Sequence, residues 1–75
     1  MKKAKQARLA NRLRVGRAER RLTQEELARA AGVTRQTISS IETGQYVPSA
    51  LLAFVLAKRL QMPVEELFHL EGDEE

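Results

Sequence analysis

The chain of 75 residues contains no cysteine and no tryptophan, and it has only one tyrosine and two phenylalanines. The absence of cysteine excludes disulfide bonds, thiolate metal sites and cysteine nucleophiles. No apolar run approaches the roughly 20 residues of a membrane-spanning helix. The basic start MKKAKQARLA lacks the apolar stretch of a signal peptide. We therefore expect one cytoplasmic domain with no membrane contact, no metal and no cofactor.

The positive charge is concentrated at one end of the chain. Residues 1–21 carry nine Lys or Arg and one Glu, whereas residues 47–75 carry two basic and six acidic side chains. The residues between them are close to neutral, and the net charge is +3. A basic end favours a polyanionic partner. A solvated helix face with a solubilising tail is the alternative interpretation of the same pattern.

The composition favours helices throughout. Ala, Leu, Arg, Glu and Gln dominate, and no segment alternates apolar and polar residues as a half-buried strand does. Five helices are expected, over residues 7–20, 24–31 and 35–43, between Ser49 and Met62, and over residues 64–68. Because the connections between them are short, the sequence predicts an all-α fold, a compact five-helix bundle.

Capping residues mark several of the expected helix ends. Thr23 followed by Glu26 is a capping-box pattern before the second helix. Thr34 and Ser49 are candidate N-caps of the third and fourth helices. Gly32 stands where a helix ends in the left-handed conformation. These signals predict that the second and third helices are joined by only a few residues around Gly32.

This pair of helices has an apolar inner face and a polar outer face. The inward positions are Leu27, Ala28, Ala31, Ile38 and Ile41. The outward positions of the third helix are Arg35, Gln36, Thr37, Ser39 and Ser40. None of the outward side chains is acidic, and all of them can donate hydrogen bonds. Because Arg and Gln can bond base edges in pairs, this face suits the major groove of DNA.

The run TQEELARAAGVTRQTISSIETGQYVPS closely resembles the Cro/CI-like helix-turn-helix family, also called XRE-like. The resemblance covers residues 9–69, and the ending VPSALLAFVLAKRLQMPVEELF is similar to the last two helices of that family. It implies a lambda-repressor-like DNA-binding bundle. The implied function is that of a sequence-specific regulator of transcription, a repressor, which binds double-stranded DNA.

The resemblance also implies a role for individual residues. The helix over residues 35–43, opened by Thr34, matches the recognition helix that enters the major groove. The positions that match base-reading residues are Arg35, Gln36 and Ser40, followed by Thr37 and Ser39. The positions that match phosphate-binding residues are Gln24, Thr34, Thr43 and Gln45, with backbone amides as the donors around Thr43 to Gln45. Gln24 also matches a residue that braces the first recognition side chain, here Arg35.

Three further features follow from the resemblance. Arg17 and Glu42 match an ion pair that joins the first helix to the end of the third. Gly16 stands where the family usually has a larger apolar residue, so we expect the first helix to pack loosely or to kink. Arg21 stands where the family often has glycine.

The ends of the chain are interpreted separately. Residues 1–8 form a basic N-terminal arm that follows DNA phosphates or the minor groove, or else a disordered basic tail. Residues 70–75 form an acidic tail that DNA would repel. His69 has no partner in metal-ligand or catalytic spacing and is expected at the surface. Leu67 and Phe68 are expected either in the core or at a dimer interface, because members of the family commonly form homodimers through their C-terminal region.

Three other functions remain open at this point. The same features are compatible with an antitoxin bound to a toxin protein, with the N-terminal DNA-binding module of a larger ligand-sensing regulator, and with a protein-binding adaptor. The basic front and the Arg-Gln face argue against the adaptor. An enzyme is the least expected class, because the sequence has no nucleophile–base pair, no Gly-rich phosphate loop and no metal cluster.

Overall fold

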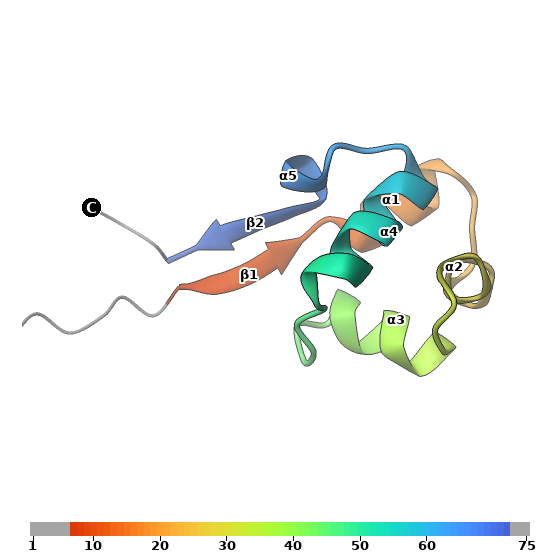
Figure 1. Ribbon diagram of the computed structural model, residues 1–75, viewed down its shortest axis with the longest axis horizontal. Coiled ribbons are helices and arrows are strands. Elements are labelled where there is room, and N and C mark those ends of the chain that lie inside the picture. The colour runs from red at the N-terminus through yellow and green to blue at the C-terminus, as the bar shows by residue number, and fades with distance from the viewer. Residues whose placement is uncertain (1–6, 73–75) are drawn as a thin grey trace, which may run out of the picture.

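The computed structural model describes residues 7–72, which form five helices and two short strands (Figure 1). The elements in chain order are β1 (Arg8–Asn11), α1 (Leu13–Glu19), α2 (Gln24–Ala31), α3 (Arg35–Glu42), α4 (Ala50–Leu60), α5 (Val64–Leu67) and β2 (Phe68–Glu71). The expected all-α bundle of five helices is confirmed, and the two-stranded sheet is added to it. None of the helices in this part of the chain has the length and apolar character to cross a membrane.

The sheet pairs the two ends of the described chain. Strands β1 and β2 are antiparallel, with Arg8 opposite Glu71 and Asn11 opposite Phe68. In Figure 1 they project from the helical body as a ribbon, while α2 and α3 lie at the other end of the molecule. The helix expected over residues 7–20 is therefore wrong in its first part. The Asn11 side chain accepts a hydrogen bond from the Leu13 amide at 3.0 Å, and α1 starts only there.

Helix ends fall where the capping residues predicted them. The Thr23 hydroxyl accepts a hydrogen bond from the Glu26 amide at 3.0 Å, and the Glu26 carboxylate accepts one from the Thr23 amide at 2.8 Å. The Thr34 and Ser49 hydroxyls each accept a hydrogen bond from an amide three residues later. Gly32 ends α2 with a φ of 76°, in the left-handed region that glycine adopts without steric cost.

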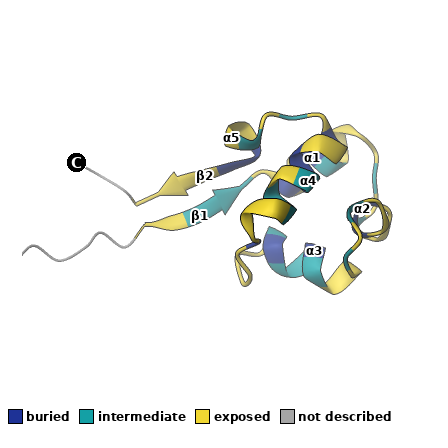
Figure 2. Ribbon diagram, in the orientation of Figure 1, coloured by how far each residue is buried: buried dark blue, intermediate teal, exposed yellow. Residues whose placement is uncertain are grey.

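The core takes at least one side chain from every helix and one from β2. Its fully or almost fully buried members are Leu13, Leu27, Ala28, Ile38, Ile41, Leu56, Ala57, Leu60, Leu67 and Phe68. Figure 2 shows burial at the centre of the helical body and exposure at the far end of the ribbon. The inward positions expected for Leu27, Ala28, Ile38 and Ile41 are confirmed. Of the two roles expected for Leu67 and Phe68, the structure gives both a place in the core.

Gly16 is buried, and the loose packing expected around it is not found. A Cβ atom at this position would lie 2.7 Å from Met62 Sδ and 3.1 Å from Leu60 Cδ1. The missing side chain therefore allows α1 to approach the end of α4 closely. Arg21 has a φ of 57°, a left-handed conformation that a non-glycine residue adopts at a cost.

Candidate nucleic-acid interface

Helices α2 and α3 meet through their apolar sides and turn a polar side of α3 outward. The connection is short, because α3 is capped by Thr34 only two residues after Gly32. The Val33 amide donates to the Ala28 carbonyl at 3.0 Å and closes the end of α2. Ile38 and Ile41 are buried against the core, so the remaining positions of α3 face solvent or its neighbours.

The five residues predicted to read bases lie along this outer side. Arg35 and Gln36 are exposed, and Thr37, Ser39 and Ser40 are partly buried. The Gln36 amide nitrogen lies 3.4 Å from the Ser40 hydroxyl, one helical turn away. No acidic side chain belongs to the group. The structure thus presents a surface of hydrogen-bonding groups on a single helix, which is the arrangement that the major groove accommodates.

Gln24, at the start of α2, holds the side chain of Arg35. Arg35 Nη1 donates to Gln24 Oε1 at 3.2 Å, and Gln24 Nε2 donates to Glu42 Oε1 at 3.1 Å. The amide of Gln24 thus uses its acceptor toward Arg35 and one of its donors toward Glu42. The bracing that the family resemblance implied for Gln24 and Arg35 is present in the structure.

The carboxylate of Glu42 is held from a second side by Arg17. Arg17 Nε lies 2.7 Å from Glu42 Oε2, and Arg17 Nη2 lies 3.3 Å from Oε1. The third guanidinium nitrogen, Nη1, donates to the Leu22 carbonyl at 2.9 Å. The Glu42 side chain is 1% exposed and that of Arg17 is 17% exposed. This buried, bidentate ion pair fixes the end of α3 against α1.

The surroundings of Glu42 favour its ionised form. Burial disfavours the charge and by itself raises the pKa of Glu42. The hydrogen bonds from Arg17 and Gln24, with the positive charges of Arg17 and Arg14, outweigh burial, so the pKa lies below its ordinary value of 4.5. Glu42 is therefore an anion throughout the neutral range, and it keeps both Arg17 and Gln24 in place.

The residues after α3 offer side chains rather than free backbone amides. The amides of Thr43, Gly44 and Gln45 donate to carbonyls of α3 at 3.1, 3.0 and 2.8 Å. The expectation that these amides reach phosphates therefore has no free donors to support it. Thr43 and Gln45 are exposed, but the Thr43 hydroxyl donates to the Ser39 and Ser40 carbonyls at 3.1 and 3.3 Å. The Gln45 side chain is therefore the donor that remains here for an external partner. Thr34 is also exposed, at the opposite end of α3.

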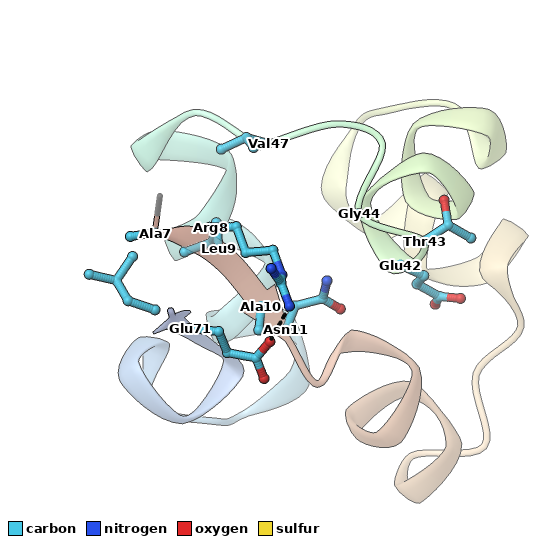
Figure 3. Close-up of a pocket in the computed structure, with 11 residues that line it drawn as sticks. Ala7, Arg8, Leu9, Ala10, Asn11, Glu42, Thr43, Gly44, Val47 and Glu71 are labelled. Carbon is cyan, nitrogen blue, oxygen red and sulfur yellow. Dashed lines mark ion pairs between the residues drawn. The ribbon is translucent and has the colours of Figure 1, made fainter. Parts of the chain in front are cut away.

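A groove of about 610 Å³ runs beside the end of α3 (Figure 3). One wall is β1, and the other includes Glu42, Thr43, Gly44 and Val47. Asn11 bridges the two walls, because its Nδ2 donates to the Ile41 carbonyl at 2.9 Å. The strand therefore supports the end of α3. Sequence reasoning missed this role because residues 7–20 were expected to form one helix.

The basic arm and the acidic tail fall partly outside the described residues. Lys2, Lys3 and Lys5 lie outside them, as do Asp73 and the two final glutamates. Arg8 belongs to β1, where its guanidinium lies 3.6 Å from the carboxylate of Glu71 (dashed in Figure 3). His69 is exposed, as expected. Whether the arm contacts DNA stays a prediction.

Apolar side chains that the core does not use lie on another part of the surface. Leu51 and Phe54 are on the first turns of α4, and Val47 precedes that helix. Each of the three is at least 60% exposed. Leu51 and Phe54 are three residues apart on one face of the helix. The structure thus offers an exposed apolar face on α4, whereas Leu67 and Phe68, for which the core and a dimer interface were both considered, lie in the core.

The sequence is similar to those of known proteins. The sequence profile of the family described as helix-turn-helix matches residues 5–67. The chain is 48% identical over 66 residues to the HTH-type transcriptional regulator MJ0272 of Methanocaldococcus jannaschii, covering 88% of this chain and all of that one. It is 44% identical over 65 residues to the HTH-type transcriptional regulator YgzD of Bacillus subtilis, covering 87% of this chain and 98% of the other.

The fold is also similar to that of a protein of known structure. The restriction-modification controller protein C.AhdI from Aeromonas hydrophila superposes with a TM-score of 0.70 at 34% identity. The match covers 73% of this chain and 80% of that one.

Proposed function

Because the chain belongs to the helix-turn-helix family of DNA-binding transcriptional regulators, we propose that it reads a short palindromic DNA sequence with α3, as a homodimer, and represses transcription there. The match to MJ0272 spans 88% of the chain, so the proposal applies to nearly all of its residues.

The observation that carries the proposal is the bracing of Arg35. An exposed arginine on a free surface samples many rotamers and loses that freedom when it binds. Arg35 is instead held by Gln24, which is itself held by the buried carboxylate of Glu42. A pre-positioned guanidinium at the start of α3 is what base recognition requires, whereas a merely solvated face would not need such support.

The chemistry of the outer face of α3 suggests which bases are read. A guanidinium fits the two acceptors O6 and N7 of guanine, so Arg35 selects a G·C pair. The carboxamide of Gln36 fits the donor and acceptor of adenine, so Gln36 selects an A·T pair beside it. Ser40 lies one turn further along and is close to Gln36. Thr37 and Ser39 lie between these positions and contribute shorter contacts.

Phosphate contacts flank this reading face. Gln24 stands at the N-terminus of α2, where free amides and the helix dipole favour an anion. Thr34 lies at the start of α3, and the side chains of Thr43 and Gln45 follow its end. Contacts of this kind fix the orientation of α3 on the duplex and carry no sequence information. They make the affinity fall as the salt concentration rises.

The exposed apolar face of α4 supports the homodimer. An apolar patch on a small protein marks an interaction surface, and a two-fold axis would bring the same patch of a second copy against it. Two copies related in this way present two recognition helices to half-sites about one turn of DNA apart. Repression then follows from occupancy of a promoter.

The test is selection of bound duplexes from a random library, followed by fluorescence-anisotropy titration across a salt series. The expected result is a palindrome with a G·C and an adjacent A·T pair in each half-site, bound at physiological salt about 10³-fold or more tightly than a scrambled duplex. A reporter with this palindrome in its promoter should be silenced by the protein. Equal binding of the selected and scrambled duplexes would rule out sequence-specific reading.

A further inference from the structure

Arg14 lies beside the contacts that Arg17 and Gln24 make with Glu42, and it has no part in the DNA contacts proposed above. Arg14 and Arg17 are three residues apart and share a face of α1. Arg14 Nε lies 3.8 Å from Glu42 Oε1, the same oxygen that accepts the hydrogen bond from Gln24 Nε2. The guanidinium of Arg14 and the amide of Gln24 are therefore neighbours around one carboxylate oxygen.

The two arginines around Glu42 differ in how far they are committed to it. All three guanidinium nitrogens of Arg17 are bonded, and its side chain is largely buried. Arg14 is 74% exposed, and within residues 7–72 its side chain makes an ion-pair contact with Glu42 but no hydrogen bond. One carboxylate neutralises one guanidinium, and Arg17 already fills that part. The charge and the donors of Arg14 thus remain for an outside anion.

The positive charge of Arg14 lies next to Gln24, at the start of α2. The helix dipole favours a phosphate at this end, but Glu25 and Glu26 in the first turn oppose it with two negative charges. The carboxylate of Glu26 is turned back onto the Thr23 amide. A cation beside Gln24 offsets these acidic charges where a phosphate would contact the helix. Arg14 is such a cation, and it comes from α1, outside the helix-turn-helix pair.

We propose that Arg14 binds the DNA phosphate that Gln24 contacts, as a cationic anchor supplied by α1. The inference rests on the proposed DNA binding by α3, and it adds Arg14 to the residues that contact the DNA phosphates. Gln24 supplies a neutral donor of fixed direction, and Arg14 supplies the charge that releases a counterion from the duplex. Arg14 acts on affinity and on its salt dependence, and it does not select a base.

The test compares Arg14→Gln with Arg12→Gln in anisotropy titrations between about 0.05 and 0.3 M salt, roughly a sixfold range. Arg12 is a matched control because it is an exposed arginine two residues away whose side chain lines a different groove, with Glu66 and His69. Both substitutions remove one positive charge. Each protein is titrated with the selected palindrome and with a scrambled duplex.

The expected result is that Arg14→Gln lowers the slope of log K against log [salt] by about one per copy bound, and weakens binding about fivefold per copy at 0.15 M salt. The loss is equal on the palindrome and the scrambled duplex. Arg12→Gln changes the affinity less than about twofold, because its charge is screened from the phosphates. Arg14→Lys keeps the charge and restores most of the slope.

Two other outcomes would each overturn the role of Arg14. If Arg14→Gln and Arg12→Gln have the same slope, Arg14 contributes no phosphate contact. If Arg14→Gln changes the preferred base at the Arg35 position, Arg14 acts through Gln24 and not on DNA. Thermal unfolding of each variant establishes that it is folded. The slope is also measured on scrambled DNA, so failure of sequence-specific reading leaves this test intact, whereas a wild-type protein that binds neither duplex would overturn both proposals.

Discussion

Arg35 and Glu42, the first and last residues of α3, are connected through one side chain of another helix. Gln24 of α2 accepts a hydrogen bond from Arg35 and donates one to Glu42. The end of α3 that is fixed to the body by an ion pair is thereby joined to the end that carries the exposed guanidinium. Four residues of three helices form one chain of contacts, from Arg17 through Glu42 and Gln24 to Arg35.

Replacement of Gln24 by alanine removes both of these hydrogen bonds and the proposed phosphate contact. We expect weaker binding to every DNA sequence and, in addition, a smaller preference for the base pair read by Arg35. Each lost hydrogen bond is worth about 1 kcal/mol. The measurement is anisotropy titration of the selected palindrome, its single-base variants and a scrambled duplex. A loss confined to one base pair would show that Gln24 only braces Arg35 and contacts no phosphate.

Replacement of Arg35 by alanine should act at one position of each half-site. If Arg35 pairs with guanine, the variant loses about 1–3 kcal/mol of discrimination at that base pair and none at the others. The matched control is Gln36→Ala, which should affect the neighbouring position. Titration against all four base pairs at each position measures both effects. A uniform loss over all sequences would assign Arg35 to the phosphates.

The buried pair of Arg17 and Glu42 makes stability depend on pH in the acid range. Because the folded-state pKa of Glu42 is depressed, its contribution is complete above the unfolded value near 4.5 and is lost as the pH falls through the folded pKa. Glu42→Gln should lose stability at pH 7 and show a smaller further loss on acidification than the wild type. Urea unfolding at pH 7, 5, 4 and 3 (roughly one unit apart in the window) measures this.

The control for this prediction is Glu25→Gln, because Glu25 is an exposed acid in the first turn of α2. Its removal should cost no more than about 0.5 kcal/mol. Removal of the buried carboxylate with Glu42→Ala leaves Arg17 without its partner and should cost about 3 kcal/mol. If the Glu25 and Glu42 variants have the same free energy of unfolding at pH 7, the pair does not stabilise the fold.

Arg21 offers a stabilising substitution. Its φ of 57° costs an L-residue about 1–2 kcal/mol, and glycine avoids this strain while it adds freedom to the unfolded chain. The net expectation for Arg21→Gly is a gain of about 0.5–1 kcal/mol in the free energy of unfolding. Arg20 has a φ of −97°, and its Nε donates to the Leu60 carbonyl at 2.9 Å, so Arg20→Gly should destabilise the protein on both counts. Urea unfolding of both variants checks the sign. A loss in both would mean that the strain at Arg21 is negligible.

The helices and their caps were predictable because their signals are local. Thr23 and Glu26 lie only three residues apart. Gly32 directly follows the last residue of α2 and has the left-handed conformation that glycine favours at a helix end. The strand β1 was not predictable in the same way. It exists because Arg8–Asn11 pairs with Phe68–Glu71 at the other end of the chain, and no local pattern records such a contact. Tertiary pairing overrides helix propensity in residues 8–11.

The candidate site was likewise predictable from the sequence only in part. The resemblance to a known family indicated Gln24, Arg35 and the pair of Arg17 with Glu42, because these positions belong to its motif. The sequence contains nine basic residues in its first 21, and nothing in their order distinguishes Arg14 from the others. Only the fold reveals that Arg14 shares a carboxylate oxygen with Gln24.

The exposed apolar face of α4 leads to a prediction about assembly. Leu51 is 75% exposed and Phe54 is 60% exposed, although each large apolar side chain gains about 1.5–3 kcal/mol when it is fully buried. A second copy that covers this face would bury both side chains twice in a two-fold dimer. An aspartate at position 54 would place two like charges across that axis, so Phe54→Asp should convert a dimer into a monomer.

Light scattering coupled to size-exclusion chromatography measures the mass of the wild type and of the variant. The control is Val15→Asp, because Val15 is an exposed apolar residue on α1, away from α4 in sequence and 41% exposed. It should leave the mass of the wild type unchanged. The monomeric variant should bind the palindrome much more weakly than the wild type, while a single half-site is bound equally by both. If Phe54→Asp keeps the mass of the dimer, the copies meet through a different surface, and the apolar face of α4 has another use.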